Sequence, residues 1–327
     1  MKKFICVTLC VLMALATMTT LTACGEKTVR LGLGLYVATP TVSNATEDGN
    51  GKAQATVTVA AVTLDAAGKI VACQLDTADT TVEFTADGKA VAKESIKTKY
   101  EAGKDYNMVT YGNAAKEWFE QADAFEGVVV GKTVDEVKAL VAAENKGTDE
   151  VINAGCTIMV SDFVKAIEKA VANAVETGAA SDDELKLGVY TQQTTKDAAG
   201  EDVKGSNKLE TTFFAAAMND DGVISAVASD CVQIEFTFDN KGASSFDTAK
   251  AISSKREQGA NYGMVAYGNA AKEWFEQADA FNAACVGKKV SEVNALMGAD
   301  NYGNADVKSA GCTILVNGFV KAAAKIG

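Results

Sequence analysis

The pentapeptide AGCTI occurs twice in the chain, at 154–158 and at 310–314. Each copy places a thiol and a hydroxyl beside a glycine, and these are the groups that could act as nucleophiles. The chain contains no histidine, which excludes Ser-His-Asp and Cys-His arrangements, a histidine general base and nearly all catalytic zinc sites. It also lacks a GxxxxGK[ST] loop and the spacing of a dinucleotide fingerprint. We therefore expect no catalytic residue or metal site of the chain's own, so any chemistry must come from a bound cofactor.

The pentapeptides belong to a longer internal repeat. YGNAAKEWFEQADAF runs from Tyr111 to Phe125 and recurs unchanged from Tyr267 to Phe281. This offset of 156 residues holds to the chain end, whereas the front halves are offset by 154. The period is far longer than that of solenoid repeats, so each copy is a domain-sized duplication. We predict two homologous domains, 31–177 and 184–327, joined by the polar segment TGAASDD.

The first half of each copy has the pattern of antiparallel strands. Residues 53–76 alternate around a DAAGK turn, and residues 209–230 alternate around NDDG. A third strand is predicted at 81–85 and at 233–238.

The second half of each copy has the pattern of helices. Asn113 is the predicted N-cap of the first helix, with Lys116 and Glu120 paired on its outer face. Thr133 and Glu136 fit a capping box, and Ser161 is the predicted cap of a third helix. The predicted inward-facing residues are Trp118, Ala122, Phe125, Phe163, Ile167 and Ala170. Strands followed by helices predict the α+β class, with an antiparallel β-hairpin sheet packed against C-terminal helices in each domain.

The N-terminus has the pattern of an export signal. Lys2 and Lys3 precede an apolar run, which ends in LTAC at 21–24. This ending resembles the lipobox of bacterial lipoproteins, which implies a signal peptide at 1–23, lipidation of Cys24 and a tether at 24–30. The mature chain would then be anchored at the outer face of the cell membrane. An ordinary cleaved signal and an uncleaved membrane anchor are the alternatives.

The charge balance limits the possible partners. Without residues 1–23 the chain has 29 basic and 43 acidic residues, so we expect no nucleic-acid partner. With 48% apolar residues it can still build full cores.

Comparison of the copies separates the cysteines into two groups. Cys73 aligns with Val227 and Cys285 aligns with Val129, which predicts buried packing positions. Cys156 and Cys312 alone are matched, and a disulfide between them stays open as an alternative.

Four features together resemble the FMN-binding domain family of secreted bacterial flavoproteins. They are a TKxE…YxM stretch, the KEWFEQADAF helix, a VGK turn and a Gly-x-Thr segment predicted as a strand. In that family a motif near DxxSGAT carries a threonine that a flavin transferase, using FAD, joins to FMN through a phosphodiester. The resemblance implies the same role for Thr157 and Thr313, with Gly155 and Gly311 as the motif glycines.

The motif departs from the family pattern at three places. Ala154 and Ala310 replace its serine, Cys156 and Cys312 replace its alanine, and its aspartate is displaced. A phosphate-linked cofactor would still suit the glycine and the threonine hydroxyl. The opposing interpretation is a buried strand whose glycine avoids a clash.

Aromatic and thioether residues are the expected neighbours of a flavin ring. Tyr106 and Met108 in the first copy, and Tyr262 and Met264 in the second, could flank it, although all four could instead be core. Trp118 and Trp274 are predicted to be core residues. The expected function is electron transfer by FMN, covalent or not, with redox partners unidentified, rather than hydrolysis or group transfer. The alternative is a non-catalytic surface lipoprotein that keeps the fold and binds a partner or small ligand without flavin.

Overall fold

The computed structural model describes residues 28–326, so the predicted signal peptide and Cys24 lie outside the described residues. The strands are β1 (Thr28–Val37), β2 (Thr41–Ser43), β3 (Gly51–Leu64), β4 (Ile70–Phe84), β5 (Ala90–Val91), β6 (Val175–Ala180), β7 (Glu184–Lys196), β8 (Gly205–Met218) and β9 (Ile224–Phe238). The α-helices are α1 (Lys99–Ala102), α2 (Met108–Gly112), α3 (Trp118–Val129), α4 (Val134–Lys138), α5 (Asp149–Ala154), α6 (Ser161–Ala172), α7 (Lys255–Gln258), α8 (Trp274–Cys285), α9 (Val290–Val293), α10 (Ala305–Ser309) and α11 (Asn317–Ala323).

The strands form two antiparallel sheets. The first has the order β5-β4-β3-β1-β6, with β2 also paired to β3, and the second has the order β7-β8-β9. The predicted hairpins are β3–β4 and β8–β9. Strands followed by helices in each copy confirm the α+β class.

The third strands predicted at 81–85 and 233–238 are wrong as separate elements, because these segments fall at the C-terminal ends of β4 and β9. A buried aspartate lies in the middle of each long strand. Asp76 accepts hydrogen bonds from the N–H groups of Thr77 and Tyr100, at 2.6 and 3.1 Å. Asp230 is bound in the same way in the second copy. Because these hydrogen bonds satisfy the buried carboxylates, each strand can continue past its aspartate.

The junction between the copies also differs from the expectation of a polar linker. Four of the seven residues of the TGAASDD segment belong to β6, which pairs with β1 through Thr28–Ala180, Arg30–Glu176 and Leu31–Val175. Without β6, β1 would be an edge strand with unpaired backbone groups, and β6 pairs with these groups.

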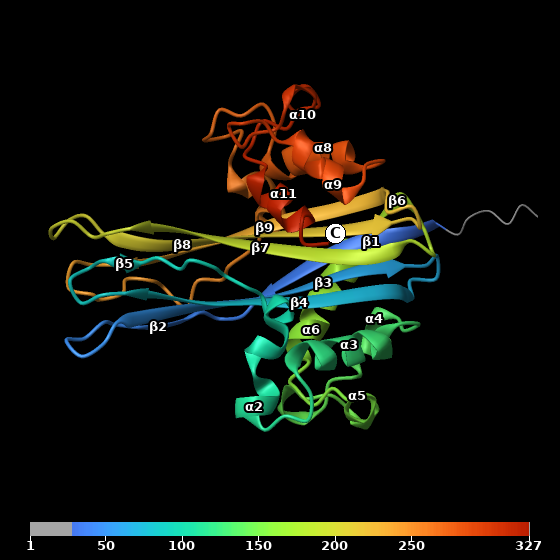
Figure 1. Cartoon of the computed structure of the whole chain (residues 1–327), viewed down its shortest axis with the longest axis horizontal. Coiled ribbons are helices and arrows are strands. Elements are labelled where there is room, and N and C mark those ends of the chain that lie inside the picture. Colours follow the sequence, from blue (N-terminus) through green and yellow to red (C-terminus); the bar gives the residue numbers. More distant parts are fainter. Residues whose placement is uncertain (1–27, 327) are drawn as a thin grey trace, which may run out of the picture.

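The two sheets pack face to face, with the helices of each copy on the outer faces, so the molecule has four layers (Figure 1). The layer between the sheets is a single apolar core with contributions from both copies, including Leu33, Val57, Phe213 and Ile234. The copies therefore share buried surface and are not separated by an open linker.

Two ion pairs cross between the copies. Lys169 on α6 pairs with Glu257 on α7, and Lys325 pairs with Glu101 on α1. The two pairs are equivalent, because the 156-residue offset relates Lys169 to Lys325 and Glu101 to Glu257. The copies thus contact each other through equivalent surfaces, as subunits do across an isologous interface.

Two of the three predicted helix starts are wrong. Helix α3 begins at Trp118 with Glu117 as its cap, whereas Asn113 has φ 52° and ends α2. The Glu117 carboxylate accepts hydrogen bonds from the N–H groups of Met108 and Val109, at 2.9 and 3.3 Å, and the Glu117 N–H donates to the Glu120 carboxylate at 2.8 Å. These bonds favour the later start. Lys116 therefore precedes the helix and forms no i,i+4 pair. Ser161 is the first residue of α6 and makes no capping hydrogen bond.

The remaining helix predictions are confirmed. Thr133 and Glu136 form the capping box of α4. The predicted inward-facing residues of α3 and α6 are all buried: Trp118, Ala122, Phe125, Phe163, Ile167 and Ala170. Within residues 28–326, none of the helices has the length and hydropathy of a membrane span.

Candidate functional site

Both AGCTI segments form turns and not the strand that the sequence predicts. Gly155 follows α5 with φ 107°, and Gly311 follows α10 with φ 102°. In this left-handed region a side chain is strained, which explains glycine at the helix end. The interpretation of AGCTI as a buried strand is therefore wrong.

The two motif cysteines point away from solvent. Cys156 and Cys312 are fully buried and free, each in the helix-side core of its own copy. The two sheets separate these cores, so the disulfide alternative is excluded. Burial raises the pKa of Cys156 to about 11, which keeps its thiol protonated.

The two motif threonines are exposed and held in the same way. The backbone N–H and the hydroxyl of Thr157 both donate to Oε1 of Gln121, at 2.8 and 2.9 Å. Thr313 makes the same two bonds to Gln277 at the same distances. Each glutamine is 1% exposed, and its amide nitrogen donates to the carbonyl oxygen of Lys116 or Lys272. The hydroxyl of each exposed threonine is thus oriented by a buried amide.

A lysine lies over each motif glycine. A methyl group on Gly155 would be 2.2 Å from Nζ of Lys116, and one on Gly311 would be 2.3 Å from Nζ of Lys272. Both copies therefore keep a positive charge beside the threonine turn.

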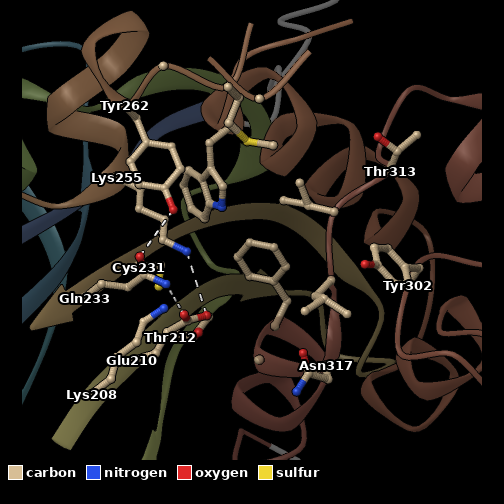
Figure 2. Close-up of a pocket in the computed structure, with 18 of the residues that line it drawn as sticks. Lys208, Glu210, Thr212, Cys231, Gln233, Lys255, Tyr262, Tyr302, Thr313 and Asn317 are labelled. Atoms are coloured by element: carbon tan, nitrogen blue, oxygen red, sulfur yellow. Dashed lines mark hydrogen bonds and ion pairs between the residues drawn. The ribbon is translucent and has the colours of Figure 1, made fainter. Parts of the chain in front are cut away.

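A pocket of about 770 Å³ lies in the second copy, between β8–β9 and the helical half (Figure 2). Its volume lies within the range of small-molecule sites. Three of the sequence-predicted residues line it, namely Tyr262, Met264 and Thr313, whereas Gly311 and Cys312 do not. The other lining residues are Lys208, Glu210, Thr212, Cys231, Gln233, Lys255, Gly263, Tyr267, Gly268, Trp274, Tyr302, Ile314, Leu315, Asn317, Gly318 and Phe319.

Aromatic side chains form much of the pocket wall. Trp274 and Phe319 are almost fully buried, and their ring centroids are 5.8 Å apart. Nζ of Lys255 lies 5.4 Å from the ring centroids of both Tyr262 and Trp274. Trp274 is therefore a core residue, as predicted, that also lines the pocket.

The polar residues gather at the side of the pocket opposite Thr313 (Figure 2). Nζ of Lys255 lies 3.8 Å from Oε1 of Glu210, and the Gln233 amide nitrogen donates to Glu210. The Tyr262 hydroxyl donates to Oε1 of Gln233 at 3.2 Å. Lys208 adds a second positive charge to the lining. Burial raises the pKa of Cys231 to about 12, so this lining thiol stays protonated.

The corresponding residues of the first copy keep the lysine–tyrosine contact and the methionine packing of the second copy, but the tyrosine is more exposed. Tyr106 is 37% exposed, with Nζ of Lys99 5.1 Å from its ring centroid, and Met108 packs against the helix-side core. Within the described residues, no group of three or more Asp, Glu or Cys side chains is placed to hold a metal ion.

Sequence reasoning missed Gln121, Gln277 and the four polar pocket residues. A signal existed for three of the latter, because Lys208, Glu210 and Gln233 stand where the equivalent strands of the first copy have Gln54, Thr56 and Asp79. Gln121 and Gln277 lie inside the unchanged helix sequence, where nothing marks them as buried.

Comparison of the chain with protein-family models, with curated proteins and with solved structures gave no match. The fold and the pocket together define a duplicated α+β protein with a small-molecule-sized site in its second copy.

Proposed function

We propose that the chain is a lipid-anchored, extracytoplasmic electron-transfer protein that binds FMN in the pocket of its second copy. The observation that carries the proposal is the convergence of Thr313, Tyr262 and Met264 on one pocket. Tyr262 and Met264 belong to one segment of the family-like pattern, and Thr313 belongs to the motif 49 positions after Met264. Anchoring and location rest on the LTAC signal alone.

The pocket residues suit the chemical parts of FMN. Tyr262, Trp274, Phe319 and Met264 offer flat and thioether surfaces to an isoalloxazine ring. The Gln233 amide can exchange hydrogen bonds with the polar edge of such a ring. The exposed hydroxyl of Thr313 is the group that a flavin transferase would esterify, and Lys272 lies near the turn that carries it.

When bound, FMN supplies the redox chemistry. The chain's own residues bind and orient it. Gln277 holds the Thr313 hydroxyl in one direction, and the aromatic wall excludes water from one side of the pocket. Lys272 places positive charge near the turn that carries Thr313, and Lys208 and Lys255 place positive charge at the opposite side of the pocket.

A second candidate is a lipoprotein that binds a small anionic ligand without flavin chemistry. The departures of the motif favour it, because Ala310 and Cys312 replace the serine and alanine that the transferase's motif contains. This candidate uses the same pocket.

Co-expression of the chain with a flavin transferase, with FAD present, tests the proposal. We expect flavin fluorescence on the denatured polypeptide, since a phosphodiester survives unfolding. Thr313→Val should remove it, and the matched Thr157→Val should leave it. If the wild type has no covalent flavin, and the native protein gains no flavin absorbance from free FMN, the ligand-binding candidate replaces the redox one.

A further inference from the structure

The two copies differ at the strand positions beside the pocket. The 154-residue offset relates Gln54 to Lys208, Thr56 to Glu210 and Asp79 to Gln233. The lysine that follows in each copy, Lys99 or Lys255, is unchanged. At three of these four polar positions the two copies therefore have different side chains, although equivalent strands hold them.

In the first copy these side chains bind one another. Oδ1 of Asp79 accepts hydrogen bonds from Gln54 at 2.6 Å and from Thr56 at 3.1 Å. Its other oxygen lies 3.3 Å from Nζ of Lys99, and both side chains of this ion pair are less than one-fifth exposed. One carboxylate therefore neutralises the lysine and occupies both neighbouring polar groups.

In the second copy the same positions leave a net positive charge. Gln233 is neutral, so Glu210 is the single carboxylate in a pocket lining that also contains Lys208 and Lys255. Glu235 lies across the strand pair from Lys208 and lines a neighbouring hollow that Lys208 and Gln233 also line, but within the described residues it forms no ion pair with Lys208. The excess charge would attract an anion.

The helical side of the pocket loses one charge of each sign in the second copy. Gly318 lines the pocket where the first copy has Asp162, a carboxylate paired with Lys165. Tyr302 also lines the pocket, and its counterpart Lys146 is paired with Glu144. These two substitutions leave the net charge of the helical side unchanged, so the charge difference between the copies comes from the strand positions.

We infer that the two copies are not equivalent sites: the second copy binds a flat anionic ligand, and this binding requires that Gln233, the equivalent of Asp79, is not a carboxylate. The inference rests on the proposed function only in naming FMN as that ligand. A carboxylate at this position opposes the ligand's charge and takes the lysine as its partner.

Titration of the full mature chain tests the inference with three probes: FMN, riboflavin, which lacks the phosphate, and 8-anilinonaphthalene-1-sulfonate, an unrelated flat anion. We expect one equivalent of each anionic probe per chain and weaker binding of riboflavin. Gln233→Asp should weaken anion binding at least roughly tenfold. Lys208→Gln, at a half-exposed site, should weaken it too, and the matched Asp79→Asn should leave it unchanged.

The outcomes separate the two proposals. Binding of the sulfonate at one Gln233-sensitive site, without FMN binding, removes the flavin proposal and keeps the inference. Two equivalents per chain, equal affinity for FMN and riboflavin, an Asp79→Asn effect as large as that of Gln233→Asp, or no binding of either anion overturns the inference.

Discussion

The rings of Phe84 and Phe238 stack between the two sheets, with centroids 4.5 Å apart and planes inclined by 3°. Phe84 and Phe238 are equivalent residues of the two copies, related by the 154-residue offset. The pair therefore lies where equivalent surfaces of the two copies are in contact. Each ring also rests on a glycine. A methyl group on Gly51 would lie 2.4 Å from the Phe84 ring, and one on Gly205 would lie 2.4 Å from the Phe238 ring.

Phe84→Ala and Phe238→Ala should each lower the free energy of unfolding by about 3–5 kcal/mol, because each leaves a cavity in the shared layer. Urea denaturation measures both. The double variant should lose less than the two losses combined, by about 0.5–1.5 kcal/mol, if the stacking itself stabilises the fold. Full additivity would show that the rings do not interact.

Glu126 should make the fold less stable as the pH rises. Burial raises the pKa of this carboxyl to about 8 from 4.5, and the Leu75 N–H, which donates at 2.6 Å, opposes the rise. A pKa that is higher in the folded state contributes stability below the unfolded value, and this stability is lost as the pH passes through the folded value. Wild-type stability should therefore fall between about pH 4.5 and pH 8.

Glu126→Gln should remove the part of this fall above pH 6, on the order of 1–3 kcal/mol in unfolding free energy. Burial raises the pKa values of Asp76 and Asp230 to about 6. These two residues should therefore still lower the stability as the pH rises toward 6, in the wild type and in Glu126→Gln. Urea titrations from pH 5 to pH 9 test this. The second copy has Asn282 at this position, so Asn282→Gln should leave the slope unchanged.

Gly311→Ala should destabilise the fold by about 1–2 kcal/mol, since φ of 102° is a strained conformation for alanine. Gly127 provides the control, because it lies within α3, has no positive φ and would place a methyl group in open space. Gly127→Ala should stabilise by about 0.5–1 kcal/mol. A loss in both variants on thermal melting would contradict the conformational explanation.

Cys73→Val and Cys285→Val should each change the unfolding free energy by less than about 1.5 kcal/mol. Both thiols are buried and free, and the sister copy has valine at each position. A larger loss in urea denaturation would show that the thiols do more than fill space. Both should also resist alkylation in the native protein, as protonated buried thiols do.

Cys24→Ser should release the protein from the membrane fraction or leave an unprocessed precursor. The prediction follows from the LTAC ending, since lipid on Cys24 would partition the wild type into a detergent phase. Mass spectrometry of the mature N-terminus checks it. A free N-terminus elsewhere in the wild type would contradict the proposed location.

Sequence patterns predicted the duplication, the hairpins and the buried helix stripes, because these depend on local periodicity. They did not predict that the sheets face each other. The structure buries β3 on both faces from Val57 to Leu64. The run VTVAAVTL is typical of a strand covered on both faces, but in an antiparallel hairpin it is interpreted as a strand with one exposed face. The start of α3 was missed because Glu117 caps it through contacts with α2, which local sequence does not display.

The candidate site was predicted only in part. Thr313, Tyr262 and Met264 meet in the pocket, but the polar side of the pocket comes from β8, β9 and α7, which are distant in sequence. The arrangement of Lys208, Glu210 and Gln233 depends on strand register, so no short motif contains it.

The crossed ion pairs Lys169–Glu257 and Lys325–Glu101 show that the halves contact each other as identical subunits would. In a dimer of identical subunits, every substitution appears on both sides of the symmetry axis. Here both halves belong to one chain, so a residue can change on one side alone. Asp79 and Gln233 are such a divergence: one half can keep a closed, self-paired surface while the other half evolves a ligand site on the same framework.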